Sequence, residues 1–152
     1  MTKRINGEII IECPADAVFD FCADERNEPR YNPRMTHAEL ASSGPIGVGS
    51  QFRAEVSTMG RKSSVIIEWT SYERPRRLAS LTRLPGMDIR GDLRFDPVAG
   101  GTILRWDWNL QPHGGLKLMR PIITLIGQRQ ERTIWASLKR LLEGLPASAT
   151  PA

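Results

Sequence analysis

The feature that most constrains the fold is an alternation of apolar and charged side chains between residues 87 and 112. The segments MDIRGDLRFDP and TILRWDWNLQP lie on either side of an AGG turn, and the intervening positions are mostly charged. The alternating apolar residues are Ile89, Leu93, Phe95, Leu104, Trp106, Trp108 and Leu110. Because side chains two positions apart share a face of a strand, the pattern predicts a β-hairpin with one covered and one solvated face.

Shorter runs before this hairpin continue the pattern. SQFRAEVSTM, SSVIIEWTSYE and LASLTRLP are separated by turn residues about every ten positions, which is typical of an antiparallel meander. The in-phase apolar positions of the first two runs are Phe52, Ala54, Val56, Val65, Ile67 and Trp69. Residues 36–42 are weakly strand-like, and residues 4–12 predict another strand. In LASLTRLP two registers stay open, with either Ser80 and Thr82 or Ala79 and Leu81 facing inward.

Helical patterns lie before and after the meander. PADAVFDFCADE predicts a short helix whose first turn contains Pro14, and a second short helix or turn is expected at residues 25–31. Residues 114–143 predict a long helix that covers the sheet. Its stripe at helical spacing is Leu116, Met119, Ile123, Ile126, Gln130, Ile134, Leu138 and Leu141. Arg120, Gln128, Glu131 and Lys139 fall largely outside that stripe.

Length and composition favour one cytoplasmic domain. The chain has 152 residues, and we expect a single domain at 1–146 followed by a frayed tail at 147–152. The net charge of +4 comes from scattered arginines, a distribution that disfavours nucleic-acid binding. The polar N-terminus does not predict a signal peptide, and PIITLIG is too short for stable membrane insertion. Cys13 and Cys22 have no zinc-type spacing, so no metal is expected.

Catalytic motifs give no assignment. GPIGVGS precedes a strand where a dinucleotide fingerprint would precede a helix, so it predicts a turn. No GxSxG is present, and neither His37 nor His113 has an evident catalytic partner. The carboxylates considered, Glu39, Glu55, Glu68 and Asp107, form no convincing acid–base pair. We therefore leave the catalytic residues unknown.

The order of these segments resembles the START-related helix-grip (SRPBCC) superfamily, within it the polyketide cyclase/dehydrase-like branch. The resemblance rests on IIIECPADAVFDFCAD, NEPRYNP, GPIGVGSQF, EWTSYERPRRLA, GGTILRWDWNLQP and ERTIWASLKRLLEG. It implies an α+β fold in which a curved antiparallel sheet wraps around a long C-terminal helix. Two short helices would close one end, with Tyr31 packing there between Pro29 and Pro33.

The resemblance also implies a cavity between the sheet and the long helix. The residues expected to line it are Val56, Ile67, Trp69, Thr82, Leu93, Phe95, Trp106, Trp108, Met119, Ile123, Ile126 and Gln130. A mostly apolar lining with a few polar groups suits a small hydrophobic ligand, such as a lipid, a polyketide-like aromatic or a terpenoid. We expect a binding protein without a cofactor, either monomeric or homodimeric. The alternatives are a cyclase or dehydratase acting in the same cavity, and an interaction module with a filled core.

Overall fold

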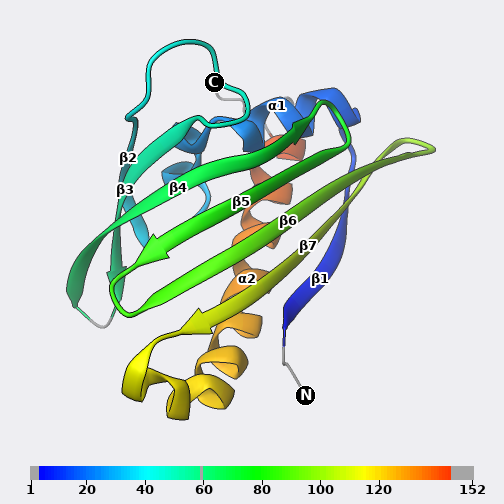
Figure 1. Cartoon of the computed structure of the whole chain (residues 1–152). Helices are drawn as coiled ribbons and strands as arrows, with labels where there is room; N and C mark the ends of the chain where they lie inside the picture. Colours follow the sequence, from blue (N-terminus) through cyan, green and yellow to red (C-terminus); the bar gives the residue numbers. More distant parts are fainter. Residues whose placement is uncertain (1–3, 59, 145–152) are drawn as a thin grey trace.

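The computed structural model describes residues 4–58 and 60–144. Figure 1 shows the chain as a sheet with helices on one of its faces. In chain order the elements are β1 (Ile5–Ile11), α1 (Ala15–Ala23), the 3-10 helix η1 (Glu25–Arg30), β2 (Met35–Leu40), β3 (Gln51–Thr58), β4 (Arg61–Glu73), β5 (Arg77–Leu84), β6 (Met87–Val98), β7 (Gly101–Pro112), the 3-10 helix η2 (Gly114–Met119) and α2 (Arg120–Gly144).

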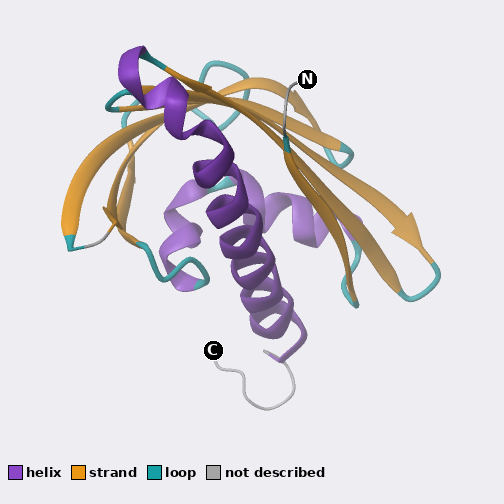
Figure 2. Ribbon diagram, turned by 90° about the horizontal axis from the view of Figure 1, so that it is seen from below, coloured by secondary structure: helices purple, strands orange, loops and turns teal. Residues whose placement is uncertain are grey.

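All seven strands belong to one antiparallel sheet, in the order β1-β7-β6-β5-β4-β3-β2. Strands β2 to β7 pair in sequence as a meander, and β1 joins the far side of β7. Figure 2 shows that the sheet curves as an arch around α2. The predicted α+β helix-grip fold is confirmed.

Alternation along the strands gives the sheet an inner apolar face, as predicted. Trp69, Ser80, Gly91 and Trp108 are successive cross-strand partners and form one row of that face. Ser80 is buried, so the register with Leu78, Ser80, Thr82 and Leu84 inward is the one that the chain adopts. The charged residues of the hairpin at 87–112 lie on the outer face.

The two short helices close one end of the arch, as predicted. Pro14 precedes α1 in extended conformation, and Val18, Phe19 and Cys22 of α1 are buried. The Phe19 ring meets the Phe95 ring edge-on at 5.2 Å. Asp24 caps η1 by accepting a hydrogen bond from the backbone N–H at position 26.

Tyr31 follows η1 and is buried at this closed end. Its ring lies 6.0 Å from the ring of Phe21 and 5.9 Å from that of Trp135, measured between centroids. The packing role that the resemblance suggested for Tyr31 therefore agrees with its position.

The side of the long helix that packs on the sheet differs from the prediction. Met119 and Ile126 leave 44% and 49% of their surface exposed, so the expectation that they cover the sheet is wrong. The buried residues of α2 are Thr124, Ile134, Trp135 and Leu138. The apolar residues at 122, 123, 125 and 126 spread over more than one side of the helix. Hydrophobic spacing alone therefore could not fix which side docks.

Contacts with β1 decide the phase of α2. Gly127 lies so close to Ile5 that an added Cβ would stand 2.4 Å from the Ile5 Cδ1 atom. The Gln128 side chain accepts a hydrogen bond from Asn6 N and donates one to Asn6 O. Lys139 donates to the carbonyl of Ile10. Polar side chains that the sequence placed off the docking face thus dock the helix on the edge strand.

The helix ends at Gly144, and the predicted tail at 147–152 lies outside the described residues. Within residues 4–58 and 60–144, every helix is too short or too polar to cross a bilayer.

Candidate functional site

The inner face of the sheet has a closed half and an open half. The closed half lies under α1, η1 and the second half of α2, and its side chains Leu78, Leu93, Phe95 and Leu104 are buried. The open half carries partly buried residues, namely Val56, Thr82, Leu84, Met87, Ile89 and Trp108. Exposed apolar residues also lie on η2 and the first half of α2, namely Leu118, Met119, Ile122, Leu125 and Ile126.

The predicted lining residues divide between these halves. Ile67, Trp69, Leu93, Phe95 and Trp106 are buried, and Trp69 donates its indole N–H to the carbonyl of Ala23 in α1. The partly buried members are Val56, Thr82, Trp108, Ile123 and Gln130. The structure therefore leaves the second group partly accessible, and Met119 and Ile126 are exposed. It places the first group largely in packed core.

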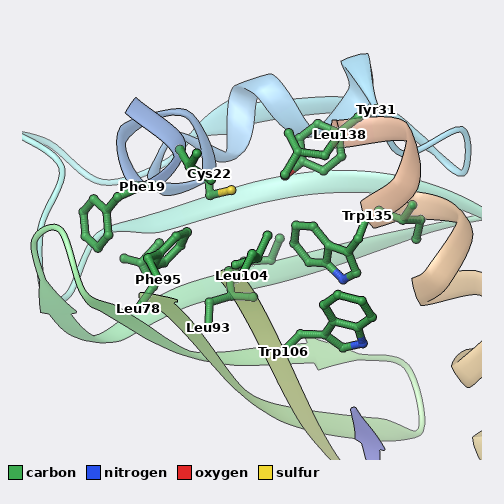
Figure 3. Packing of buried hydrophobic residues seen from close by; sticks show 14 of the residues in the cluster. Phe19, Cys22, Tyr31, Leu78, Leu93, Phe95, Leu104, Trp106, Trp135 and Leu138 are labelled. Atoms are coloured by element: carbon green, nitrogen blue, oxygen red, sulfur yellow. The ribbon is translucent and has the colours of Figure 1, made fainter. Parts of the chain in front are cut away.

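Two indole rings mark the boundary between the halves. The ring of Trp108 lies across Gly91, where an added Cβ would stand 2.1 Å from it. The ring of Trp106 lies across Gly7 in the same way, at 2.5 Å. Trp106 also stacks on Trp135 of α2, with centroids 5.6 Å apart and planes inclined by 26° (Figure 3). Glycine at both strand positions thus lets a large ring lie flat on the sheet.

A carboxyl group, Glu131, lies between the indoles of Trp108 and Trp135. Its Oε1 atom accepts hydrogen bonds from Trp108 Nε1 at 2.6 Å and from Trp135 Nε1 at 3.0 Å. Burial raises the pKa of Glu131 to about 7, although the two indole donors and Arg34 act in the opposite direction. The negative charge of Glu28 adds to the increase. A carboxyl group that titrates near neutral pH on an apolar face is a candidate functional group.

Sequence reasoning missed Glu131 because it assigned the residue to the polar side of the helix. The spacing of Thr124, Gly127, Glu131 and Leu138 does describe one helical face. That face contains few large apolar residues in its first half, so the isoleucine stripe gave the stronger signal. One tryptophan donor, Trp135, is four residues further along the same helix, but only the fold brings Trp108 to Glu131.

A second buried carboxyl group lies in the closed half. Glu25 of η1 is 7% exposed, and burial followed by the neighbouring Glu28 raises its pKa well above the usual range. Its Oε2 atom has no hydrogen-bond partner among the described residues. Trp106 Nε1 and Thr124 Oγ1 are likewise fully buried without such a partner. These three buried polar atoms therefore lack a hydrogen-bond partner among the described residues.

Arg34 connects α2 to the far side of the arch. Its guanidinium donates to Gln130 on α2 and, at 3.0 Å, to Thr58 at the end of β3. Beside this bridge is a largely apolar pocket of about 190 Å³, lined by Pro33, Arg34, Arg129, Gln130, Thr133 and Ile134. A larger, polar depression of about 420 Å³ lies on the outer face around Asp92 and Arg105.

The two histidines lie outside the open half. The His37 side chain is 64% exposed beside Glu39, and that of His113 is 58% exposed beside Asp88. Both pairs involve solvated side chains, as the sequence suggested for His113. Among the residues that the structure describes, no group of three or more His, Cys, Asp or Glu side chains could hold a metal ion.

The sequence matches, over residues 2–143, the family described as polyketide cyclase / dehydrase and lipid transport. This match covers most of the chain, and the protein therefore belongs to that family of START-like (SRPBCC) proteins. Comparison with curated proteins gave no significant match.

Solved structures of similar fold come from several bacteria. A START superfamily protein from Mycobacterium smegmatis has a TM-score of 0.79 and 14% identity, covering 93% of this chain and 98% of its own. The Zhui aromatase/cyclase from Streptomyces sp. R1128 has a TM-score of 0.78 and 15% identity, with both chains covered completely. The protein TTHA0849 from Thermus thermophilus has a TM-score of 0.77 and 16% identity, covering 97% of this chain and 100% of its own. At these identities the likeness establishes the fold alone.

Proposed function

We propose that this protein binds a small hydrophobic molecule between the open half of the sheet and the first half of α2. The observation that carries the proposal is the incomplete burial of apolar side chains on both sides of that space. Val56 and Ile89 on the sheet and Ile123 on the helix all remain partly accessible. Apolar surface left in contact with water favours an apolar partner that removes it.

The family supports the proposal at the level of ligand class. Its description includes both lipid transport and polyketide cyclisation, activities that handle hydrophobic molecules. The polar groups at the inner edge of the space, Glu131 and Gln130, would orient such a ligand. A mostly apolar surface with a few polar groups is the usual composition of a small-molecule site.

A matched pair of substitutions tests the location of the site. Val56→Phe places a ring in the proposed space, while Val48→Phe adds the same ring to a loop position that is 69% exposed. We expect Val56→Phe to lower the affinity for N-phenyl-naphthylamine, a neutral fluorescent probe, at least about fivefold, or ~1 kcal/mol. Val48→Phe should bind the probe like the wild type. Equal binding by all three proteins would contradict the proposed location.

The natural ligand can be sought directly. Organic-solvent extraction of the purified protein, followed by mass spectrometry, should release a hydrophobic compound that is depleted in extracts of the Val56→Phe variant. An extract of Val48→Phe provides the background.

A second candidate function is a cyclase or dehydratase that acts on a polyketide-like chain in the same space. The pKa of Glu131, near 7, is the specific observation in its favour, because a general acid or base works best when its pKa is close to the operating pH. Incubation with a polyketide-type substrate would test it. A product formed by the wild type and lost in Glu131→Gln would establish the enzymatic function.

A further inference from the structure

We propose that the free oxygen of Glu131, Oε2, is the recognition point for a ligand hydroxyl group of the phenol or enol type. This inference rests on the proposed function, because it names the polar group of the ligand that would occupy the open half. It also specifies which atom of the protein meets that group.

The geometry separates the roles of the two carboxyl oxygens. Oε1 receives both indole N–H groups, from Trp108 and Trp135, so its lone pairs are occupied. Oε2 accepts no hydrogen bond from any described residue. Unlike the orphaned oxygen of Glu25, it is not fully buried and keeps some accessible surface. The tryptophans thus fix the carboxyl plane and leave one oxygen available.

The surroundings make a hydroxyl group the best match for Oε2. Trp108 belongs to the partly buried floor of the open half, so an aromatic ligand on that floor would lie beside Glu131. A wholly apolar ligand would leave Oε2 without a hydrogen-bond partner, whereas a phenol or enol can donate to it.

The protonation state of Glu131 gives the inference a measurable signature. The charged groups that act on Glu131 are Glu28 from the closed end and Arg34 from the loop before β2, and Glu131 in turn helps to raise the pKa of the nearby Tyr31. Because Oε1 already accepts two donors, the proton of the neutral acid resides on Oε2. Neutral Oε2–H can donate to a hydroxyl or an ether oxygen alike. The carboxylate can only accept, and it therefore favours a hydroxyl and disfavours an ether.

The test compares β-naphthol with its methyl ether by equilibrium dialysis at about pH 6 and about pH 8. Naphthol itself stays neutral at both values, since phenols ionise near about 10. For the wild type we expect the ratio of naphthol to ether affinity to rise roughly fivefold to tenfold between the two pH values. Loss of ether binding should contribute to that rise.

Two variants on the same helix complete the test. Glu131→Gln keeps the oxygen that accepts from both indoles and replaces Oε2 with an NH₂ group, so its ratio should not change with pH. Glu143→Gln is the matched control, because that carboxylate instead accepts from the backbone N–H of Glu12 and from Lys139. It should behave as the wild type does.

The outcomes separate this inference from the proposed function. If neither compound binds, the binding function fails and the inference fails with it. If both bind but the wild-type ratio is the same at both pH values, the open half binds ligands and Glu131 does not recognise them. A pH-dependent ratio that persists in Glu131→Gln would also overturn the inference. The wild-type measurements decide the question alone if circular dichroism shows Glu131→Gln to be misfolded.

Discussion

The two halves of α2 pack against the same curved sheet with very different completeness. In the second half, Ile134, Trp135 and Leu138 are buried against β1, β7 and the short helices. In the first half, Ile122, Leu125 and Ile126 remain exposed although four of the five residues from 122 to 126 are apolar. Stability therefore comes mainly from the closed half, and the open half carries apolar surface that the fold does not need. The following predictions test that division, from the largest expected effect to the smallest.

Truncating a leucine should be strongly destabilising in the second half of α2 and nearly neutral in the first half. Leu138 has no exposed surface, so Leu138→Ala should lower the free energy of unfolding by about 2–5 kcal/mol through lost burial and an unfilled cavity. Leu125 is 61% exposed, and Leu125→Ala should change it by less than about 0.5 kcal/mol. Urea unfolding measures both. Similar losses in the two variants would show that the first half of α2 is docked as tightly as the second.

A side chain at Gly91 should displace the indole at the boundary. Gly91→Val would place methyl groups within the ring of Trp108, and overpacking of this kind costs about 1–3 kcal/mol. The shift of Trp108 would also remove a hydrogen bond from Glu131. We expect a lower urea midpoint together with a changed tryptophan fluorescence spectrum. Gly100→Ala, in the hairpin turn with no atom near its Cβ, tests instead the cost of a positive φ.

The carboxyl group of Glu131 should make the unfolding free energy fall as the pH rises. Its pKa is raised from about 4.5 in the unfolded chain to about 7 in the folded protein, so the native state binds the extra proton between these values. The contribution of this extra proton to the unfolding free energy is present in full below about pH 4.5 and is lost as the pH rises through about 7. Relative to wild type, Glu131→Gln should therefore gain about 1–3 kcal/mol of unfolding free energy between about pH 5 and pH 8. Parallel pH profiles for the two proteins in urea melts would contradict this expectation.

Filling the open half should cost little. Val56 is partly buried at the end of β3, so Val56→Phe should leave the unfolding free energy within about 0.5 kcal/mol or raise it. In a filled core the same change would cost about 1–3 kcal/mol. Thermal and urea melts distinguish the two outcomes. A loss of about 2 kcal/mol would mean that no free space adjoins Val56 and would favour the interaction-module alternative.

The smallest effect is expected where the sequence prediction was wrong. Hydrophobic spacing placed Ile126 against the sheet, and a carboxylate there would then cost several kcal/mol. Because Ile126 is 49% exposed, Ile126→Asp should change the unfolding free energy by less than about 0.5 kcal/mol, as measured in urea. Severe destabilisation would show that Ile126 faces the sheet, as its spacing in the sequence predicted.

The sequence by itself determined the sheet and the order of its elements. Alternation in MDIRGDLRFDP and TILRWDWNLQP is a local property, because a strand places successive side chains on opposite faces whatever lies above it. Turn residues between the runs set the meander, and Pro14 with its following apolar positions defined α1. The fold class and the closure of one end followed from these local signals together with the family resemblance.

Tertiary structure alone decided the phase of α2 and the environment of Glu131. Two apolar sides compete in the first half of the helix, and the choice between them depends on Gly127 approaching Ile5 and on hydrogen bonds from Gln128 and Lys139 to β1. The raised pKa of Glu131 depends on burial and on partners more than twenty residues away, such as Trp108. Hydrogen bonds between distant residues are properties of the assembled fold, and the sequence around Glu131 does not indicate that Trp108 will be its partner.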